Sequence, residues 1–161
     1  MARPGKTRVL AGQELLLSPE AFQGPTGLVV LEKLRPKIQQ CTACPLHEHR
    51  KQAVCGEGAW NSPRIAFVGE APGSQEDAQG RPFVGPSGKL LDRLLAAMGL
   101  TRDQVYITNV VKCRPPNGRI PQPAELAQCA GYLQREIALV QPKMIVAMGR
   151  FANQVLLSGH P

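Results

Sequence analysis

The sequence predicts an α/β fold in which helices cover both faces of a parallel β-sheet. Three short runs rich in apolar or β-branched residues, at 64–69, 104–112 and 143–149, are each followed by a segment with helical spacing of its apolar side chains. This alternation of strand and helix is typical of parallel sheets, because each return of the chain crosses a face of the sheet. The chain of 161 residues is about the size of one domain, and we expect residues 27–161 to form it.

Before the first predicted strand the chain has one candidate helix. Residues 1–26 are rich in proline and glycine and predict an irregular extension. The stretch TGLVVLEKLRPKIQQ, residues 26–40, predicts a helix that is interrupted or kinked near Pro36, because proline has no N–H for the helix ladder. Residues 44–63 show no sustained hydrophobic period and predict a loop.

The first predicted strand, residues 64–69, ends in glycine and opens onto a long polar, glycine-rich loop at 70–88. Residues 88–99 predict a helix, because five apolar side chains recur at helical spacing and Gly99 supplies a stop.

The second and third predicted strands follow the same scheme. Residues 104–112 are β-branched, and the prolines that come next predict an irregular loop before a helix at 124–140. The third strand leads into a helix at 150–157. Sites in such sheets lie beyond the carboxyl ends of the strands, so we expect functional residues in the loops after Val68, Val111 and Met148.

The net charge of +7 at pH 7 favours a polyanionic partner, because each Lys or Arg near a phosphate releases counterions. Hydrophobic residues make up 43% of the chain, which argues against a disordered protein. No apolar run approaches the ~20 residues of a membrane span, and LLL at 15–17 is too short for a signal peptide. We therefore expect a cytoplasmic location, associated with the nucleoid when DNA is bound.

Five cysteines indicate a metal or cluster site, because thiols stay reduced in the cytosol. Cys41 and Cys44 form a C-x2-C pair, Cys113 follows the second predicted strand, and Cys129 lies on the next predicted helix. Four thiolates suit either zinc or an iron–sulfur cluster. Zinc ligands usually come as two close pairs, so one close pair with two separated cysteines favours a cluster, and both options stay open. Cys55 is expected to pack as a small apolar side chain.

Several motifs, in order, resemble those of one enzyme family. They are GEAPG at 69–73, RPFVGPSGKLLD at 81–92 and VYITNVVKCRPP at 105–116, with a cysteine on the following helix. With them the chain resembles the family 4 uracil-DNA glycosylases, the iron–sulfur members of the uracil-DNA glycosylase superfamily, from about Leu31 to Leu157. The resemblance implies hydrolysis of the N-glycosidic bond of a flipped-out deoxyuridine in base excision repair, with uracil-containing DNA as the partner of a monomer.

The resemblance also implies a structural [4Fe–4S] cluster bound by Cys41, Cys44, Cys113 and Cys129. Cys55 matches no ligand position. Such a cluster would tie the N-terminal helix to the loop and helix after the second strand.

Uracil excision needs a pocket that grips an extruded base, and Asn109 and Phe83 are the candidates for that grip. Asn109 ends the second predicted strand, where its amide can accept from uracil N3–H and donate to O4. Cytosine presents the opposite pattern, which would leave buried polar groups unpaired. Phe83 stands where the family carries a stacking phenylalanine. The alternatives are an Asn that closes a turn and a Phe that fills the core, and the resemblance favours the site.

The glycine-rich loop carries two candidate catalytic carboxylates, Glu70 and Glu76. A carboxylate positions water or offsets the positive charge that develops on the sugar, and the resemblance points to both residues for water positioning and pocket shape. Ala71 stands where a related family has an Asp that acts on water. That role is unavailable here, and we expect Ala71 to line the uracil pocket. Asp77 is expected to be a solvated loop charge.

Four polar residues are candidate DNA-phosphate contacts. Ser87 and Lys89 open a predicted helix, and helix N-termini bind phosphates. Lys112 and Arg114 flank the predicted cluster loop, with Arg119 farther along it. A plain helix cap and a solvated basic loop are the alternatives.

Family members carry a His-Pro motif downstream of the third strand, whose histidine contacts uracil O2. Here His160-Pro161 follows the helix at 150–157 by only a few residues, so we expect a coincidental dipeptide and a chain whose C-terminal part is missing. Two alternatives to a glycosylase stay open: a non-catalytic iron–sulfur DNA-binding module on the same scaffold, and a zinc-stabilised interaction domain.

Overall fold

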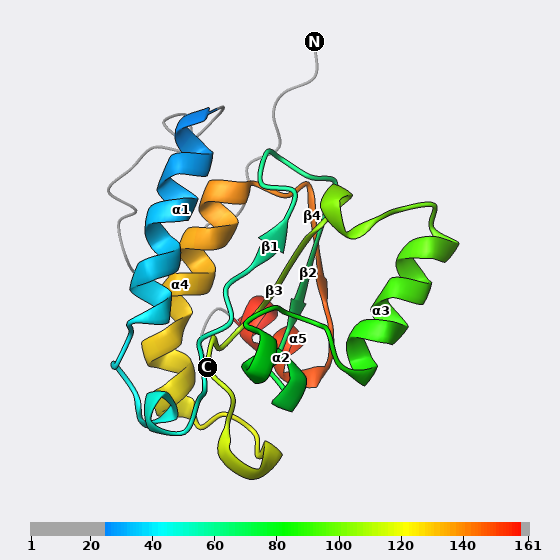
Figure 1. The fold of residues 1–161 in the computed structure, drawn as a ribbon. Coiled ribbons are helices and arrows are strands. Elements are labelled where there is room, and N and C mark those ends of the chain that lie inside the picture. The colour runs from blue at the N-terminus through cyan, green and yellow to red at the C-terminus, as the bar shows by residue number, and fades with distance from the viewer. Residues whose placement is uncertain (1–24, 159–161) are drawn as a thin grey trace.

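The structure, a computed structural model that describes residues 25–158, contains a mixed four-stranded sheet (Figure 1). Its strands lie in the order β1-β3-β2-β4. β2 pairs in parallel with both β3 and β4, as predicted, whereas β1 is antiparallel to β3. The prediction of a purely parallel sheet is therefore wrong at this edge, because a two-residue strand has no hydrophobic pattern to reveal it. The strands are β1 (Glu57–Gly58), β2 (Ile65–Gly69), β3 (Tyr106–Asn109) and β4 (Met144–Ala147).

The helices follow the strands in the predicted order. α1 precedes the sheet, α2 and α3 follow β2, α4 follows β3 and α5 follows β4. Short 3-10 turns occupy Pro45–Glu48, Arg102–Gln104 and Pro116–Gly118. The helix bounds are α1 (Pro25–Gln39), α2 (Ser74–Gln79), α3 (Pro86–Ala97), α4 (Pro123–Val140) and α5 (Arg150–Ser158).

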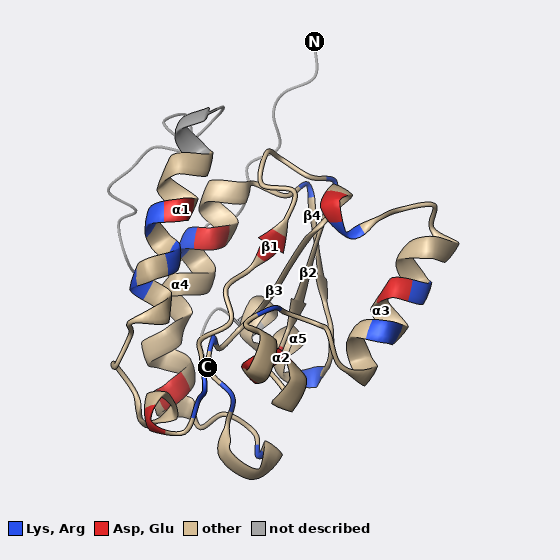
Figure 2. Cartoon of the chain, viewed as in Figure 1, with Lys and Arg blue, Asp and Glu red and all other residues tan. Residues whose placement is uncertain are grey.

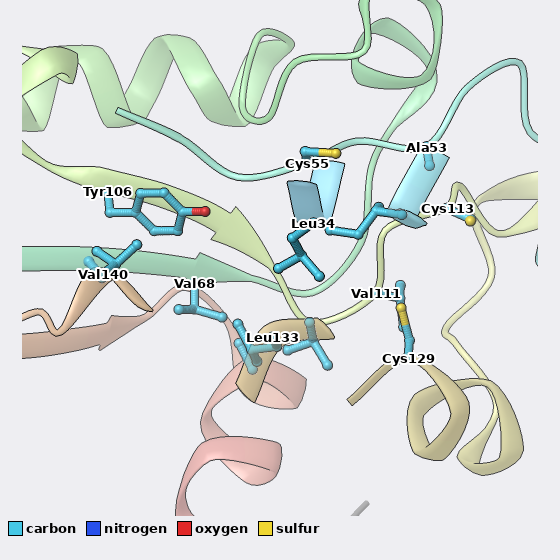
Figure 3. Close-up of a cluster of buried hydrophobic side chains, with 14 of the residues drawn as sticks. Leu34, Ala53, Cys55, Val68, Tyr106, Val111, Cys113, Cys129, Leu133 and Val140 are labelled. Carbon is cyan, nitrogen blue, oxygen red and sulfur yellow. The ribbon is translucent and has the colours of Figure 1, made fainter. Parts of the chain in front are cut away.

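Helices cover both faces of the sheet, as predicted. Ala66 and Val68 of β2 are fully buried in a core that they share with α1, α4 and α5 (Figure 3). Phe67, between them, points to the opposite face and packs with Leu91 and Leu95 of α3. This alternation is the two-residue period of a strand that is buried on both sides.

Two local predictions differ from the structure. α1 runs without interruption through Pro36, and beyond that residue the helix ladder resumes with the bond from the Gln40 N–H to the Pro36 carbonyl at 2.9 Å. The loop predicted at 70–88 contains α2, a six-residue helix between Gly73 and Gly80. A helix this short shows too little periodicity to be detected from the sequence. The expectations for residues 1–24 and for His160-Pro161 lie outside the described residues.

Basic side chains are spread over several elements rather than gathered in one patch. Figure 2 shows Lys and Arg on α1, α3 and α4 and on loops at the lower end of the sheet, where β2 and β3 end. Among the described helices, none is long and apolar enough to cross a bilayer.

Candidate functional site

The loops that follow β2, β3 and β4 meet at the carboxyl edge of the sheet, where a site was predicted. The Val110 N–H donates to the Gly69 carbonyl at 2.8 Å, and the Val111 N–H donates to the Glu70 carbonyl at 3.1 Å. On the other side of β2, the Met148 N–H donates to the Val68 carbonyl at 2.8 Å. These bonds continue the parallel ladder beyond the strands and hold the three loops side by side.

Asn109 and Phe83 converge on Gly69 at this edge. The residue Asn109 is 3% exposed and Phe83 is 9% exposed. A Cβ at position 69 would overlap both the Asn109 Oδ1 and the Phe83 ring, so glycine is required here by close packing. Among the described residues, the Asn109 side-chain amide has no hydrogen-bond partner, whereas the backbone carbonyl of Asn109 accepts from Lys112. A buried amide therefore presents a free donor and a free acceptor beside an aromatic ring.

Phe83 is held in a backbone conformation that is unusual for its residue type. Its φ of 53° lies in the left-handed region, which costs on the order of 1–2 kcal/mol for a residue with a Cβ. Arg102 stabilises the turn by donating to the Phe83 carbonyl and, at 3.1 Å, to the Pro82 carbonyl. A Cβ on Gly88 would overlap the Phe83 carbonyl, so the first turn of α3 packs directly against this peptide.

Glu76 links the starts of two helices beneath Phe83. One carboxylate oxygen accepts from the N–H groups of Val84 at 2.9 Å and Gly85 at 2.8 Å, and the other accepts from Gly73 at 3.1 Å. Gly85 and Gly73 are the N-caps of α3 and α2, where a negative charge complements the helix dipole. Glu76 therefore shapes the loop that carries Phe83.

Glu70 and Ala71 lie half-buried directly after β2. Burial raises the pKa of the Glu70 carboxyl above its usual range, and the positive charge of Arg150 on α5 partly opposes that rise. Ala71 packs against the core formed with α1, α4 and α5. Of the two candidate catalytic carboxylates, Glu70 is thus the one whose oxygens are not occupied by backbone N–H groups in the described structure.

The four cysteines predicted as ligands line one pocket between α1, α4 and the loop after β3. Cys41 and Cys44 are half-buried, while Cys113 and Cys129 are buried. Arg50 donates to the Cys113 Sγ at 2.9 Å, and the Lys112 N–H donates to the Cys129 Sγ at 3.3 Å.

The electrostatics and spacing of these thiols are distinctive. Burial raises the pKa of Cys129 to about 12 and also raises the pKa of Cys113, for which Arg50 acts in the opposite direction. A metal has to displace these protons on binding. Among the described residues, no three His, Cys, Asp or Glu side chains lie close enough together to hold a single ion.

Cys55 lies outside this pocket, as expected for a packing residue. It is 7% exposed and belongs to the core cluster around Leu34 (Figure 3). Burial raises its pKa to about 11, with the nearby Glu136 charge adding to the effect.

Two charged residues are buried against expectation. Lys112, predicted to contact phosphate, is 1% exposed and bonded to Glu136 in the interior, so that prediction is wrong. Asp77, predicted as a solvated charge, is also 1% exposed and accepts from the Lys51 N–H at 2.8 Å. In both cases the partner comes from a distant segment, which is why the local sequence suggested a loop charge.

The remaining phosphate candidates do lie at the surface. Ser87 and Lys89 are exposed in the first turn of α3, and Arg114 is half-buried in the loop after β3. Arg119 is instead engaged in a bidentate pair with Glu125, at 2.6 and 2.8 Å.

Sequence reasoning missed several residues that build the site. Arg102 supports the Phe83 turn, and Arg50 donates to a predicted ligand sulfur. Neither stands in a recognisable motif, so no local signal marks them. Gly69 did carry a signal, because a glycine that ends a strand often marks a close approach.

Comparison with known proteins agrees with this architecture. Residues 55–161, more than half of the chain, match the uracil DNA glycosylase superfamily. The chain belongs to this superfamily. It is 50% identical over 129 residues to the type-4 uracil-DNA glycosylase of Sulfurisphaera tokodaii, covering 80% of this chain and 58% of that protein. It is 48% identical over 130 residues to the type-4 uracil-DNA glycosylase of Thermotoga maritima, covering 81% and 67%.

Within the superfamily the likeness is greater to the type-4 proteins than to a type-5 protein. The type-5 uracil-DNA glycosylase of Thermus thermophilus is 34% identical, with 75% of this chain and 70% of that protein covered. The resemblance inferred from the motifs is thus confirmed. The chain spans 58% to 67% of the length of the two type-4 relatives.

Proposed function

We propose that this chain excises uracil from DNA by hydrolysing the N-glycosidic bond of a flipped-out deoxyuridine. The observation that carries the proposal is the convergence of the free Asn109 amide and the Phe83 ring on Gly69, at the carboxyl edge of a superfamily sheet. An extruded base is bound by hydrogen bonds to its Watson–Crick edge and by stacking on an aromatic side chain.

Asn109 supplies the reading of the base. Its Oδ1 accepts from uracil N3–H while its Nδ2 donates to O4, and cytosine offers the reverse at those two atoms. Because Asn109 is only 3% exposed and its amide has no competing partner among the described residues, a mismatched base leaves desolvated groups unpaired, which discriminates strongly. Phe83 stacks on the base from a loop braced by Arg102 and Glu76.

Glu70 and Glu76 have different roles in the proposed reaction, because their carboxylates have different surroundings. Glu70, with its raised pKa, is the better base for a water molecule that attacks the sugar. Its negative charge also offsets the positive charge that develops on the sugar. Glu76 positions the Phe83 loop through three backbone N–H groups, and Ala71 borders the same pocket.

The thiol pocket fits a [4Fe–4S] cluster held by Cys41, Cys44, Cys113 and Cys129. What supports the proposal is that all four thiols line one pocket, and four cysteine thiolates are the usual ligand set of such a cluster. The N–H groups that point at the Cys113 and Cys129 sulfurs are the kind of donor that tunes such clusters. When bound, the cluster supplies cross-linking: it ties the segment after α1 to the loop after β3 and to α4.

In this proposal, DNA contacts exposed polar and basic residues beside the site. Ser87 and Lys89 lie at the N-terminus of α3, and Arg114 lies beside the thiol pocket. The net charge of +7 predicts binding that weakens steeply with salt. We also propose that residues 27–161 form one domain and that the chain acts as a monomer.

The test is a single-turnover excision assay on oligonucleotides that carry one deoxyuridine, thymidine or deoxycytidine at the same position. We expect release of uracil alone. Asn109→Asp should lower uracil excision by at least about tenfold, or 1.4 kcal/mol of transition-state stabilisation, because a carboxylate cannot donate to O4. Weak cytosine excision is expected to appear, since the carboxylate accepts from its amino group.

Asn61→Asp is the matched control, because Asn61 is exposed near the opposite end of β2. DNA binding without release of uracil would contradict the proposal and leave a non-catalytic DNA-binding module. Unchanged excision by Asn109→Asp would show that Asn109 only closes a turn.

A further inference from the structure

Lys112 is a charged residue that the proposed chemistry does not use. Its side chain is 1% exposed, so it reaches neither solvent nor DNA. Its ammonium group donates to the Glu136 Oε2 at 2.6 Å, the Thr108 Oγ1 at 2.7 Å and the Asn109 carbonyl at 2.8 Å. These contacts use all three protons of the ammonium group.

The Glu136 carboxylate that pairs with Lys112 has further donors. Besides Lys112, the Glu136 carboxylate accepts from the Thr108 hydroxyl at 2.7 Å and from the Gly56 N–H at 3.0 Å. Glu136 lies on α4 and is also 1% exposed. A buried ion pair of this kind is often replaceable by apolar residues without loss of stability, so stability alone does not account for it. Its position has to be considered.

The network of Lys112, Glu136 and Thr108 lies next to Asn109, the residue proposed to bind the base. Lys112 follows Asn109 by three residues and bonds back to its carbonyl, which closes a loop around the end of β3. The backbone of Lys112 is fixed as well: its N–H donates to the Cys129 Sγ at 3.3 Å, and its carbonyl accepts from Val54 at 2.7 Å. The peptide of Asn109 is therefore anchored to α4 and to the segment before β1.

We propose that Lys112 is a positioning residue for Asn109: its ammonium group, neutralised by Glu136, fixes the Asn109 peptide so that the side-chain amide stays aimed at the base. The inference rests on the proposed uracil excision. Lys112 then has two separate effects. Charge neutralisation by Glu136 governs folding, whereas the bond to the Asn109 carbonyl governs base selection.

The test uses a double variant that removes the charge pair without leaving a buried ion. Lys112→Met with Glu136→Gln keeps the side-chain volumes similar, and the amide oxygen of the introduced glutamine remains an acceptor for the Gly56 N–H. Each single variant leaves its partner buried and unpaired and should be less stable than the double variant. Lys33→Met, on the exposed face of α1, controls for the loss of one positive charge.

Four quantities are measured on each full chain: iron content, urea midpoint, single-turnover excision, and binding to DNA that carries 2′-fluorinated deoxyuridine or deoxycytidine, which resist excision. The double variant should keep its iron and its overall DNA affinity. We expect excision to fall by about tenfold or more, the scale set by one lost polar interaction. The ratio of uracil to cytosine binding should narrow by a similar factor, whereas Lys33→Met should change neither.

A purely structural role would move the urea midpoint and leave the uracil-to-cytosine ratio unchanged, and that result in a folded double variant would overturn the proposal. If the double variant does not fold, Lys112→Gln with Glu136→Gln decides, because the shorter side chain withdraws the donor from the Asn109 carbonyl, while the two amides still offer partners to each other and to Thr108. A wild-type ratio in that variant would likewise overturn it. A wild-type chain that releases no uracil would contradict the proposed function itself, and this inference with it.

Discussion

One added methyl group at position 69 is expected to disrupt the base site, because it overlaps the side chains that form the site. Gly69→Ala places a Cβ 2.5 Å from the Phe83 Cζ and 2.8 Å from the Phe83 Cε2, and on top of the Asn109 Oδ1. Real Cβ atoms do not approach so closely, so one of the two side chains has to leave its place. Neither has free room, because both are at least nine-tenths buried. The backbone of Phe83 is held by Arg102.

The magnitude follows from what the displaced groups supply. Two hydrogen bonds to the base contribute about 1 kcal/mol each, and stacking contributes about 1–3 kcal/mol. Their loss amounts to roughly 3–5 kcal/mol, which lowers single-turnover excision by about 10²- to 10⁴-fold. Overpacking should lower the free energy of unfolding by about 1–3 kcal/mol, so the variant is assayed only after urea unfolding shows that it is folded.

Gly131→Ala is the matched control for this glycine substitution. Gly131 lies within α4, and a Cβ there meets nothing within 4 Å. The alanine should stabilise the helix by about 0.8–1 kcal/mol and leave excision unchanged. Excision by folded Gly69→Ala at the wild-type rate would refute the reasoning, since it would mean that Asn109 and Phe83 do not form the base site together.

Two further predictions concern the thiol pocket and an ion pair. Cys113→Ala should lose bound iron and the visible absorbance of a cluster, whereas Cys55→Ala should retain both, because only Cys113 lines the pocket; the reverse pattern in metal analysis would contradict the ligand assignment. The hydrogen bond from Arg119 lowers the pKa of Glu125 below 4.5, so the pair stabilises the fold above that value and the contribution disappears as the pH falls through the lowered pKa. The difference in urea midpoint between wild type and Arg119→Gln should therefore be constant near neutral pH and shrink as the pH falls below 4.5; a difference that stays undiminished down to the pH at which the wild type itself unfolds would exclude Glu125 as its source.

The order of strands and helices was predictable because it depends on local patterns. Apolar runs, apolar side chains at helical spacing and prolines each act within a few residues, and β2, β3, β4, α3, α4 and α5 all form where they were expected. The short elements β1 and α2 were not predicted, because segments of two and six residues show too little hydrophobic periodicity.

The chemistry-bearing residue types were also visible in the sequence, in the C-x2-C pair and in the motifs around Phe83 and Asn109. What the sequence determined by itself is thus the set of candidate residues and the edge of the sheet where they gather. The sequence did not show which of these candidate residues face the site and which support it from the interior.

The tertiary structure decided that division, because the state of a charged side chain depends on partners that are distant in sequence. Lys112 looked like a phosphate contact until Glu136, 24 residues away, was found to neutralise it in the core. Asp77 looked solvated, yet it binds a backbone N–H 26 residues earlier. A charge can be buried only where opposite charge or hydrogen-bond donors surround it, and only the folded chain brings those groups together.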